Sequence, residues 1–407
     1  MKRKISFDAK SNYIPVIMRR WLLVLKAKLI FLKKEGVIMR KNRVFFGLLA
    51  ILTLSLFLSG CAGKQPVEQT SSKESEKTKV AFVYVGPVGD AGWSYAHEQG
   101  RLYLEQNLSD VITTKVESVP EGADAERVLS QLAEQGNKII FATSYGYMDS
   151  VIKVAKNYPQ VVFMHCSGYK TAENVGTYFG RMYQSRYLSG LVAGKMSKSN
   201  NIGIAGAYPI PEVVRLINAT ALGARAVNPQ ARIKVVWINA WYDPAREKEA
   251  ANSLLEAGCD VIVQETDSAA TMQAAEEKGK YGVGYNSDMS KMAPMAVLTS
   301  STWNWGPYYV ETVKAVREGR WKSTKEWLPM KEGIVGLAPF GPMVPGDVKT
   351  LVEEQKQRIF KGEWDVFTGP IKDQNGNVRV SDGQKMSDDE MWNFNWFVEG
   401  VDGVIPK

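Results

Sequence analysis

Histidine and cysteine are scarce in this 407-residue chain, which has two histidines, His97 and His165, and three cysteines, Cys61, Cys166 and Cys259. No two cysteines form a CxxC pair, and no HExxH motif is present. These absences argue against a disulfide framework and the usual zinc sites. Without a GxSxG turn, and with so few histidines, a serine or cysteine hydrolase is also disfavoured. We therefore expect no metal, no cofactor and no catalytic centre.

The net charge of +8 comes from the N-terminal segment alone. Residues 1–60 contain 13 Lys+Arg against 2 Asp+Glu, so the remaining 347 residues carry 38 basic and 41 acidic groups, a net of −3. Binding to a phosphate backbone requires a basic face on the folded domain itself. The main body therefore has no electrostatic basis for binding nucleic acid.

The longest apolar run covers residues 44–58 and follows a basic segment at 39–43. This run is shorter than the roughly 20 residues of a membrane span, but it suits the central region of a secretory signal. It ends in Leu58-Ser59-Gly60-Cys61, which fits the lipobox of bacterial lipoproteins. We predict that Cys61 is acylated and tethers the mature chain to the membrane. An uncleaved anchor with an incidental cysteine is the alternative.

The chain around this signal divides into a leader and a tether. Basic residues interrupt the apolar positions of residues 1–38, and Met39 begins a complete lipoprotein signal without them. Either the start is over-extended, or residues 1–38 form a basic amphipathic segment. Residues 61–79 have almost nothing to bury and are predicted to be an extended tether. We expect the folded body to begin at residue 80.

The body repeats a pattern of strand, turn and amphipathic helix. Apolar strands are predicted at 80–85, 115–119, 138–143, 161–165, 201–206, 233–239, 260–264 and 282–285. Apolar strands that alternate with helices indicate parallel sheets covered on both faces.

We predict an α/β fold with two Rossmann-like lobes. The first lobe takes residues 80–190 and about 300–330, the second takes 191–299, and residues 331–407 return across the lobes. Ligands of such sheets bind at the carboxyl ends of the strands. The cleft between the lobes is therefore the candidate site, and turn residues after strands are its candidates.

A glycine-rich turn, GPVGDAG over residues 86–92, follows the first strand. Its GxxGxxG spacing differs from the GxGxxG dinucleotide fingerprint, and no Gly-Lys-Ser/Thr follows, so it is a poor match to a phosphate-binding loop. Trp93 comes directly after the turn. Residue chemistry alone leaves two roles open for Trp93, packing as core over the sheet or offering a flat face to a ligand.

Several motifs, taken in order, resemble the basic membrane protein family. They are the lipobox cysteine, GPVGDAGWSYAHEQGR at 86–101, KNYP at 156–159, IPEVVRLINATALGARAVNP at 210–229 and NSD at 286–288. Members of this family are substrate-binding lipoproteins of ABC importers and are related to bacterial purine nucleoside receptors. The likeness covers most of residues 79–320 and is less distinct over the C-terminal 80 residues.

The resemblance implies a periplasmic-binding-protein type I fold that closes over a purine and delivers it to an ABC transporter permease. In the nucleoside-binding members, the aromatic residue of the first-turn motif packs on the base, and Trp93 occupies that place, next to Gly92. Stacking of a purine on indole is worth about 1–3 kcal/mol by analogy with base–aromatic stacking elsewhere. Trp93 is therefore the strongest ligand candidate.

Two positions depart from the nucleoside pattern of the family. Nucleoside receptors usually carry Gly-Val-Asp after the late strand and a lysine after the following Thr-Ser. This chain has Asn286 and Trp303 at the corresponding places. An amide and an indole thus replace the carboxylate and ammonium that suit ribose. We expect Asn286 to face a purine edge and Trp303 to fill the volume of a sugar, which favours a free nucleobase over a nucleoside.

Further candidates follow strands in both lobes, because a ligand that bridges the lobes stabilises the closed state. They are Ser144, Tyr145, Ser167 and Gly168 in the first lobe, and Asn218, Trp241, Glu265, Asp267 and Asp288 in the second. A carboxylate suits the ring N–H donors of guanine or xanthine, and an asparagine suits adenine. Asp267 and Asp288 also suit helix caps, and Tyr145 also suits a surface position at a hinge.

The leading hypothesis is a receptor, lipid-anchored on the outer face of a bacterial cell membrane, that passes a purine base or nucleoside to an ABC permease. A signalling lipoprotein that uses the same closure is the alternative. An enzyme acting on nucleosides would need an aspartate cluster or a phosphate site, and residues 80–93 offer only Asp90. A two-lobed transcriptional regulator would need a DNA-binding headpiece, whose place the leader occupies.

Overall fold

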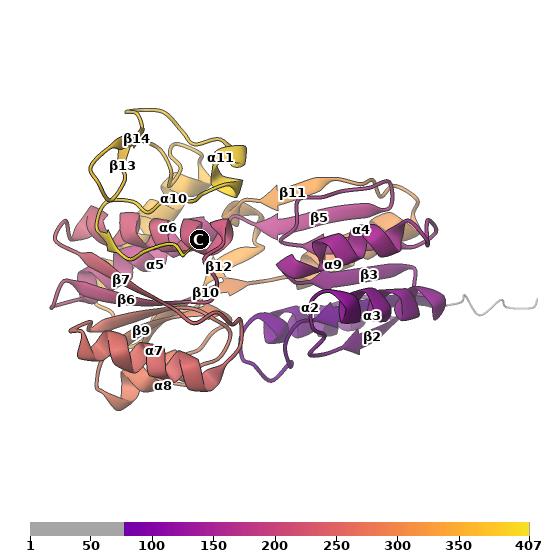
Figure 1. Ribbon diagram of the computed structural model, residues 1–407, viewed down its shortest axis with the longest axis horizontal. Coiled ribbons are helices and arrows are strands. Elements are labelled where there is room, and N and C mark those ends of the chain that lie inside the picture. The colour runs from indigo at the N-terminus through magenta and orange to yellow at the C-terminus, as the bar shows by residue number, and fades with distance from the viewer. Residues whose placement is uncertain (1–76, 407) are drawn as a thin grey trace, which may run out of the picture. The chain divides into compact units, whose positions relative to one another are not determined.

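The computed structural model describes residues 77–406, which form two α/β lobes (Figure 1). The predicted leader, Cys61 and the tether up to residue 76 lie outside the described residues. Over the described range, no helix combines the length and the apolar character that crossing a bilayer requires.

The first lobe is built on a six-stranded parallel sheet in the order β11-β5-β4-β3-β1-β2. Its elements are β1 (Thr78–Tyr84), α2 (Trp93–Asn107), β2 (Val111–Val116), α3 (Ala123–Glu134), β3 (Ile139–Thr143), η1 (Tyr145–Tyr147), α4 (Met148–Ala155), β4 (Val162–Cys166), β5 (Val175–Gly180), α9 (Gly306–Arg317) and β11 (Lys325–Leu328). In β1, Val80, Phe82 and Tyr84 pack toward α2 and α9, whereas Ala81 and Val83 pack toward α3 and α4. Both faces of the sheet are therefore buried, which explains the continuous apolar runs.

The second lobe holds a seven-stranded sheet in the order β12-β10-β9-β8-β6-β7-β15, in which only the β10–β12 pair is antiparallel. Its elements are α5 (Met182–Met196), β6 (Asn201–Gly206), α6 (Pro211–Val227), β7 (Arg232–Trp237), α7 (Pro244–Glu256), β8 (Val261–Glu265), α8 (Ala270–Glu277), β9 (Tyr281–Asn286), β10 (Val297–Trp303), η2 (Met330–Glu332), β12 (Val335–Leu337) and α10 (Gly346–Phe360). Helices α5 and α6 cover one face of this sheet, and α7 and α8 cover the other (Figure 1). The two parallel-sheet series confirm the predicted fold class.

The chain passes between the lobes three times, after β5, after β10 and after β11. Strand β10 belongs to the second sheet, so the expected lobe boundary near residue 300 falls inside a strand. Beyond α10, the chain forms β13 (Ile371–Lys372), β14 (Val378–Val380), α11 (Asp388–Trp392) and β15 (Val401–Asp402). Strand β15 pairs with β7 and so extends the second sheet.

Candidate functional site

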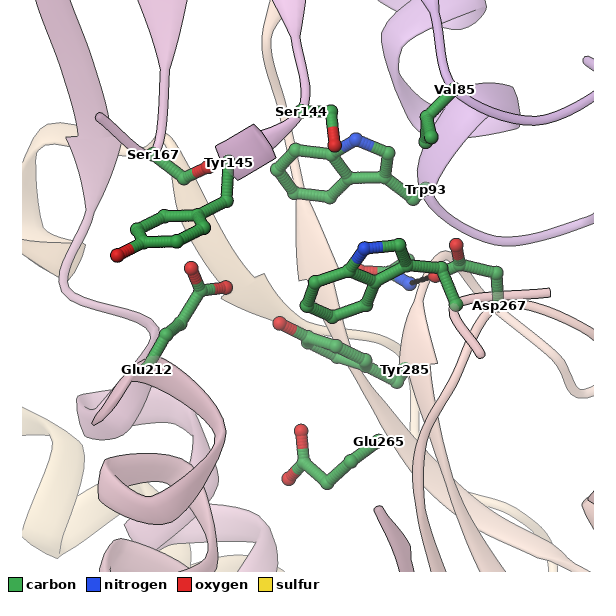
Figure 2. Close-up of a pocket in the computed structure, with 11 residues that line it drawn as sticks. Val85, Trp93, Ser144, Tyr145, Ser167, Glu212, Glu265, Asp267 and Tyr285 are labelled. Atoms are coloured by element: carbon green, nitrogen blue, oxygen red, sulfur yellow. Dashed lines mark hydrogen bonds between the residues drawn. The ribbon is translucent and has the colours of Figure 1, made fainter. Parts of the chain in front are cut away.

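A cavity lies between the carboxyl ends of the strands of the two lobes (Figure 2). The volume that the centre of a water-sized sphere can reach inside it is about 30 Å³, which is small beside the roughly 300–1,000 Å³ of small-molecule sites. Its lining residues are Val85, Trp93, Ser144, Tyr145 and Ser167 from the first lobe, and Glu212, Trp241, Glu265, Asp267, Tyr285 and Asn286 from the second. In Figure 2 the first-lobe side chains face Glu212, Tyr285 and Glu265 across the opening.

The cavity brings together eight of the thirteen ligand-binding residues proposed from the sequence. Three further lining residues, Val85, Glu212 and Tyr285, were not among those candidates. Val85 ends the first apolar run, and Tyr285 directly precedes Asn286, so both stand beside turns that had been chosen. Glu212 lies inside the 210–229 motif, immediately after a proline that marks the start of a helix.

The indole of Trp93 is held by a hydrogen bond and by three neighbouring aromatic rings. Its Nε1–H donates to the carbonyl of Thr143 at 2.6 Å. The rings of His97, Trp303 and Trp305 stand nearly perpendicular to it, with centroids 4.4, 5.7 and 5.8 Å away. Trp93 is half-buried and also lines the cavity. It therefore combines the two roles that residue chemistry left open, since it packs on an aromatic cluster and presents indole surface to the cavity.

Gly92 lies at the rim, where the two lobes touch. A Cβ atom at this position would overlap the carbonyl oxygen of Asp267 and come within 2.7 Å of its Cα. Nearby, the hydroxyl of Ser287 donates to the carbonyl of Ala91. Gly92 thus permits a backbone-to-backbone approach between the lobes, which a side chain would obstruct.

Glu265 is fully buried at the floor of the cavity. Its Oε1 lies 2.9 Å from Nε of Arg186, also fully buried, but among the described residues no donor is aligned for a hydrogen bond with either carboxylate oxygen. Burial raises the pKa of Glu265 to about 7, although the guanidinium of Arg186 lowers it. That guanidinium also lies 4.1 Å from the ring centre of Tyr285. Glu265 is therefore a desolvated, ion-paired acceptor with lone pairs left for a ligand in the cavity.

Asp267, Asn286 and Trp303 form a hydrogen-bonded chain. The amide of Asn286 donates to Asp267 Oδ1 at 2.9 Å and accepts from Trp303 Nε1 at 3.0 Å. Trp303 does not line the cavity, because it is buried behind Asn286 and stacked on Trp305 at 4.5 Å. Burial first, and then the charge of Asp90, raise the pKa of Asp267 well above its ordinary value. Asn286 keeps one N–H and one lone pair free for a ligand.

Glu212 is the second residue of α6 and is half-buried. Its carboxylate points into the cavity near Tyr145 (Figure 2). Within the part of the chain that the structure describes, this carboxylate has neither a hydrogen-bond donor nor an ion-pair partner. Arg215, one turn further along α6, instead donates to the carbonyl of Met391 at 2.6 Å. Burial raises the pKa of Glu212 to about 7, and Arg215 only partly offsets this.

Tyr145 and two serines complete the first-lobe wall, and Trp241 stands on the second lobe. The hydroxyl of Ser144 donates to Glu121 Oε1 at 2.6 Å, which leaves its lone pairs for a ligand. Ser167 adopts a positive φ of 64° directly after β4. Trp241 packs at 62° against Tyr208, with ring centres 5.0 Å apart.

Gly168 and Asp288 do not line this cavity. Gly168 packs on the ring of His165, which a Cβ atom would overlap, and borders a neighbouring hollow. Asp288 is exposed, and its Oδ1 accepts from the backbone N–H of Ser290 at 2.9 Å. No helix begins here, so this contact closes a local turn and is not the helix cap considered for Asp288.

Asn218 also lies outside the cavity. Its amide is buried in α6, donates to the carbonyl of Trp396 at 2.8 Å and accepts from the N–H of Val398 at 3.0 Å. Asn218 therefore holds the C-terminal segment against the second lobe.

The cavity has a one-sided electrostatic character. Three carboxyl groups, those of Glu212, Glu265 and Asp267, line it, and none of its lining residues is a lysine or an arginine. An anionic ligand such as a nucleotide would meet like charge without a compensating cation. Flat rings that carry N–H donors fit the aromatic side chains and the acceptors far better.

Comparison with known proteins identifies related sequences. The family model described as ABC transporter substrate-binding protein, PnrA-like, matches residues 77–365. A purine-binding protein of Brucella abortus is 49% identical over 333 residues, which cover 82% of this chain and 95% of that protein. A protein of Haloferax volcanii, provisionally named as a glucose-binding protein of an ABC transporter, is 41% identical over 334 residues, 82% of this chain and 83% of that protein.

Solved structures show the same architecture. A solute-binding protein of an ABC transporter system from Aeropyrum pernix superposes with a TM-score of 0.62 at 19% identity, covering 78% of this chain and 98% of that one. At this identity the likeness concerns the fold alone.

Proposed function

The chain belongs to the PnrA-like family of ABC transporter substrate-binding proteins, and from this premise we propose that its ligand is a purine, with a free nucleobase preferred over a nucleoside. The membership confirms the family resemblance noted in the sequence. Proteins of this class bind solutes outside the cytoplasmic membrane and present them to a permease. We infer a role in binding and delivery of a solute.

The observation that carries the purine proposal is the presence of Trp93 and the carboxylate acceptors of Glu212 and Glu265 in one cavity. Trp93 is held by Thr143 and its aromatic neighbours, so a base can stack on it without first ordering the indole. Glu265 is ion-paired with Arg186 but has no donor in the described part of the chain aligned with its oxygens, Glu212 lines the cavity beside it, and a purine supplies N–H groups at its edges. The relative from Brucella abortus, named for purine binding, supports the same ligand class.

The preference for a nucleobase rests on Asn286 and on the absence of lysine and arginine among the residues that line the cavity. Asn286 is tied to both Asp267 and Trp303, so its amide is held in one orientation and offers a single donor and a single acceptor. Such a group suits a base edge better than the pair of vicinal hydroxyls of ribose. The stacked Trp303 and Trp305 occupy the space behind Asn286, which leaves no room there for a sugar.

Calorimetry on the soluble chain from residue 62 onward tests this proposal. We expect adenine, guanine or hypoxanthine to bind at least about tenfold more tightly than the matching nucleoside, a difference of about 1.4 kcal/mol. Native mass spectrometry of the freshly purified chain should show a co-purified purine base. Tighter binding of nucleosides would reverse the nucleobase preference, and binding of glucose without any purine would overturn the ligand class.

We also propose that the receptor is anchored by acylation of Cys61, which lies outside the described residues. Expression of the full chain in a bacterial host should place it in the membrane fraction and label it with a fatty-acid analogue. Cys61→Ser should abolish the label, while Cys259→Ser, a buried thiol of the body, should not. Persistent labelling of the Cys61→Ser variant would disprove this anchor site.

A signalling receptor would also close its two lobes over the ligand. Transport and signalling differ in the partner that recognises the closed receptor. Transport requires that purine uptake by a host depends on this gene together with a permease. Sensing predicts that uptake survives its deletion.

A further inference from the structure

Glu212 and Asp267 stand at opposite ends of the cavity as seen in Figure 2. A flat ligand that spans the cavity and stacks on Trp93 therefore presents one edge toward each of them. Asp267 already accepts a hydrogen bond from Asn286. Glu212 has no such partner among residues 77–406 and is half-buried, so a ligand edge that faces it and excludes solvent has to supply the hydrogen bonds of its carboxyl group.

No cation is placed to hold Glu212 in its ionised form by direct contact. The guanidinium of Arg215 donates to Met391 and lies 4.9 and 5.2 Å from the ring centres of Trp327 and Trp392. Arg186 is engaged by Glu265 and by backbone carbonyls.

Several titratable or charged groups face Glu212 from the elements around it. They are Tyr145, Cys166, Arg215, Glu265, Asp267 and Tyr285. Only Arg215 is cationic, and the two carboxyl groups oppose a further negative charge. Burial accordingly raises the pKa of Glu212 to about 7, where neutral and ionised forms coexist.

The two forms of a carboxyl group recognise different purine edges. A neutral carboxyl offers one donor beside one acceptor, whereas an ionised carboxylate only accepts. Adenine presents an amino N–H beside a ring nitrogen acceptor, and hypoxanthine presents a ring N–H beside a carbonyl oxygen. Guanine alone among these three presents two adjacent N–H donors, which match an ionised carboxylate in two parallel hydrogen bonds.

We propose that Glu212 determines purine specificity at this site: its neutral carboxyl pairs with the donor–acceptor edge of adenine or hypoxanthine, and its ionised form pairs in this bidentate way with guanine but not with adenine or hypoxanthine. This inference rests on the proposed function. The selectivity of the receptor therefore shifts toward guanine as the pH rises.

The sign of the pH effect follows from where the proton is held. Bound adenine requires the proton on Glu212, and the free group has a pKa of about 7. The affinity for adenine is then at its maximum below pH 7 and falls above it, by up to about tenfold per pH unit. Guanine affinity does not fall over the same range.

Calorimetric titration of wild-type and Glu212→Gln chains with adenine and guanine, from about pH 6 to about pH 8.5, tests the proposal around a pKa of about 7. A glutamine keeps one donor and one acceptor at every pH. We expect Glu212→Gln to remove the pH dependence of adenine binding, to exceed wild-type adenine affinity above pH 8, and to lose guanine affinity relative to the wild type.

Two control variants separate this effect from others. Glu265→Gln, the second cavity carboxyl with a pKa of about 7, should weaken both purines at every pH and keep the adenine pH profile. Glu256→Gln, exposed on α7, should behave as the wild type. Thermal unfolding of each variant checks that it folds.

The outcomes distinguish this inference from the proposed function. If the wild type binds no purine, the proposed function fails and the inference fails with it. If purines bind but Glu212→Gln keeps the wild-type pH profile and adenine-to-guanine ratio, only the role of Glu212 is overturned. A pH profile abolished by Glu265→Gln instead would assign the proton to Glu265.

Discussion

Replacing Gly92 with alanine should weaken purine binding about 100-fold without unfolding the protein. The added Cβ would overlap the carbonyl oxygen of Asp267 across the rim, so the two backbones could no longer approach as closely when the lobes close. Overpacking of this kind costs about 1–3 kcal/mol, and 2.8 kcal/mol corresponds to about 100-fold in affinity. Because a ligand that bridges the lobes gains from their closure, the cost appears in binding.

A matched control stands three residues away in the same turn. A Cβ atom on Gly89 would meet nothing within 4 Å, so Gly89→Ala should bind purine as the wild type does. Calorimetry measures both affinities, and small-angle scattering should show that Gly92→Ala stays more open in the presence of ligand. Wild-type affinity in Gly92→Ala would mean that closure does not depend on this contact.

Replacing Trp93 with alanine should weaken purine binding by at least tenfold. Base–aromatic stacking is worth about 1–3 kcal/mol, and tenfold corresponds to about 1.4 kcal/mol. The indole is fixed by its hydrogen bond to Thr143 and by three perpendicular rings, so little of this free energy is spent on ordering it. Trp93→Phe should recover part of the affinity, since it keeps a ring but loses the Thr143 bond.

The control for Trp93 is a tryptophan that does not line the cavity. Trp364 packs against Tyr187 on the far side of α5, and its removal should reduce stability with little change in purine affinity. Calorimetry on both variants compares the losses. Unchanged affinity in Trp93→Ala would exclude Trp93 from the ligand site.

The order of strands and helices could be predicted because it depends on local patterns. The apolar runs of β1 and β3 are buried on both faces, and such strands carry their signal within five to seven residues. The convergence of turn residues was also predictable, since carboxyl ends of parallel strands meet at one edge. For that reason Ser144, Glu265 and Asn286, each at the end of a strand or directly after it, line one cavity together with Trp93, which follows the turn after β1.

The contacts of Glu212 and Asn218 could not be predicted from the sequence. On a helix, a glutamate three residues before an arginine suggests an ion pair on a solvated face. The structure instead turns Arg215 to the carbonyl of Met391, 176 residues along the chain, which leaves Glu212 to the cavity. Asn218 had a polar side chain within an apolar helix, but segments 178 and 180 residues away give both of its amide atoms a hydrogen-bond partner.

The sequence by itself determined the fold class, the family and the turns that carry the site. The spacing of apolar residues and the short motifs depend only on residues that are close together in the chain. Only the tertiary structure decided which polar groups are left unpaired. A buried donor or acceptor is satisfied by whichever segment packs on it, and for Arg215 and Asn218 that segment comes from the far C-terminal part of the chain. The exposure of the carboxyl groups of Glu212 and Glu265 to one cavity is therefore a property of the assembled lobes.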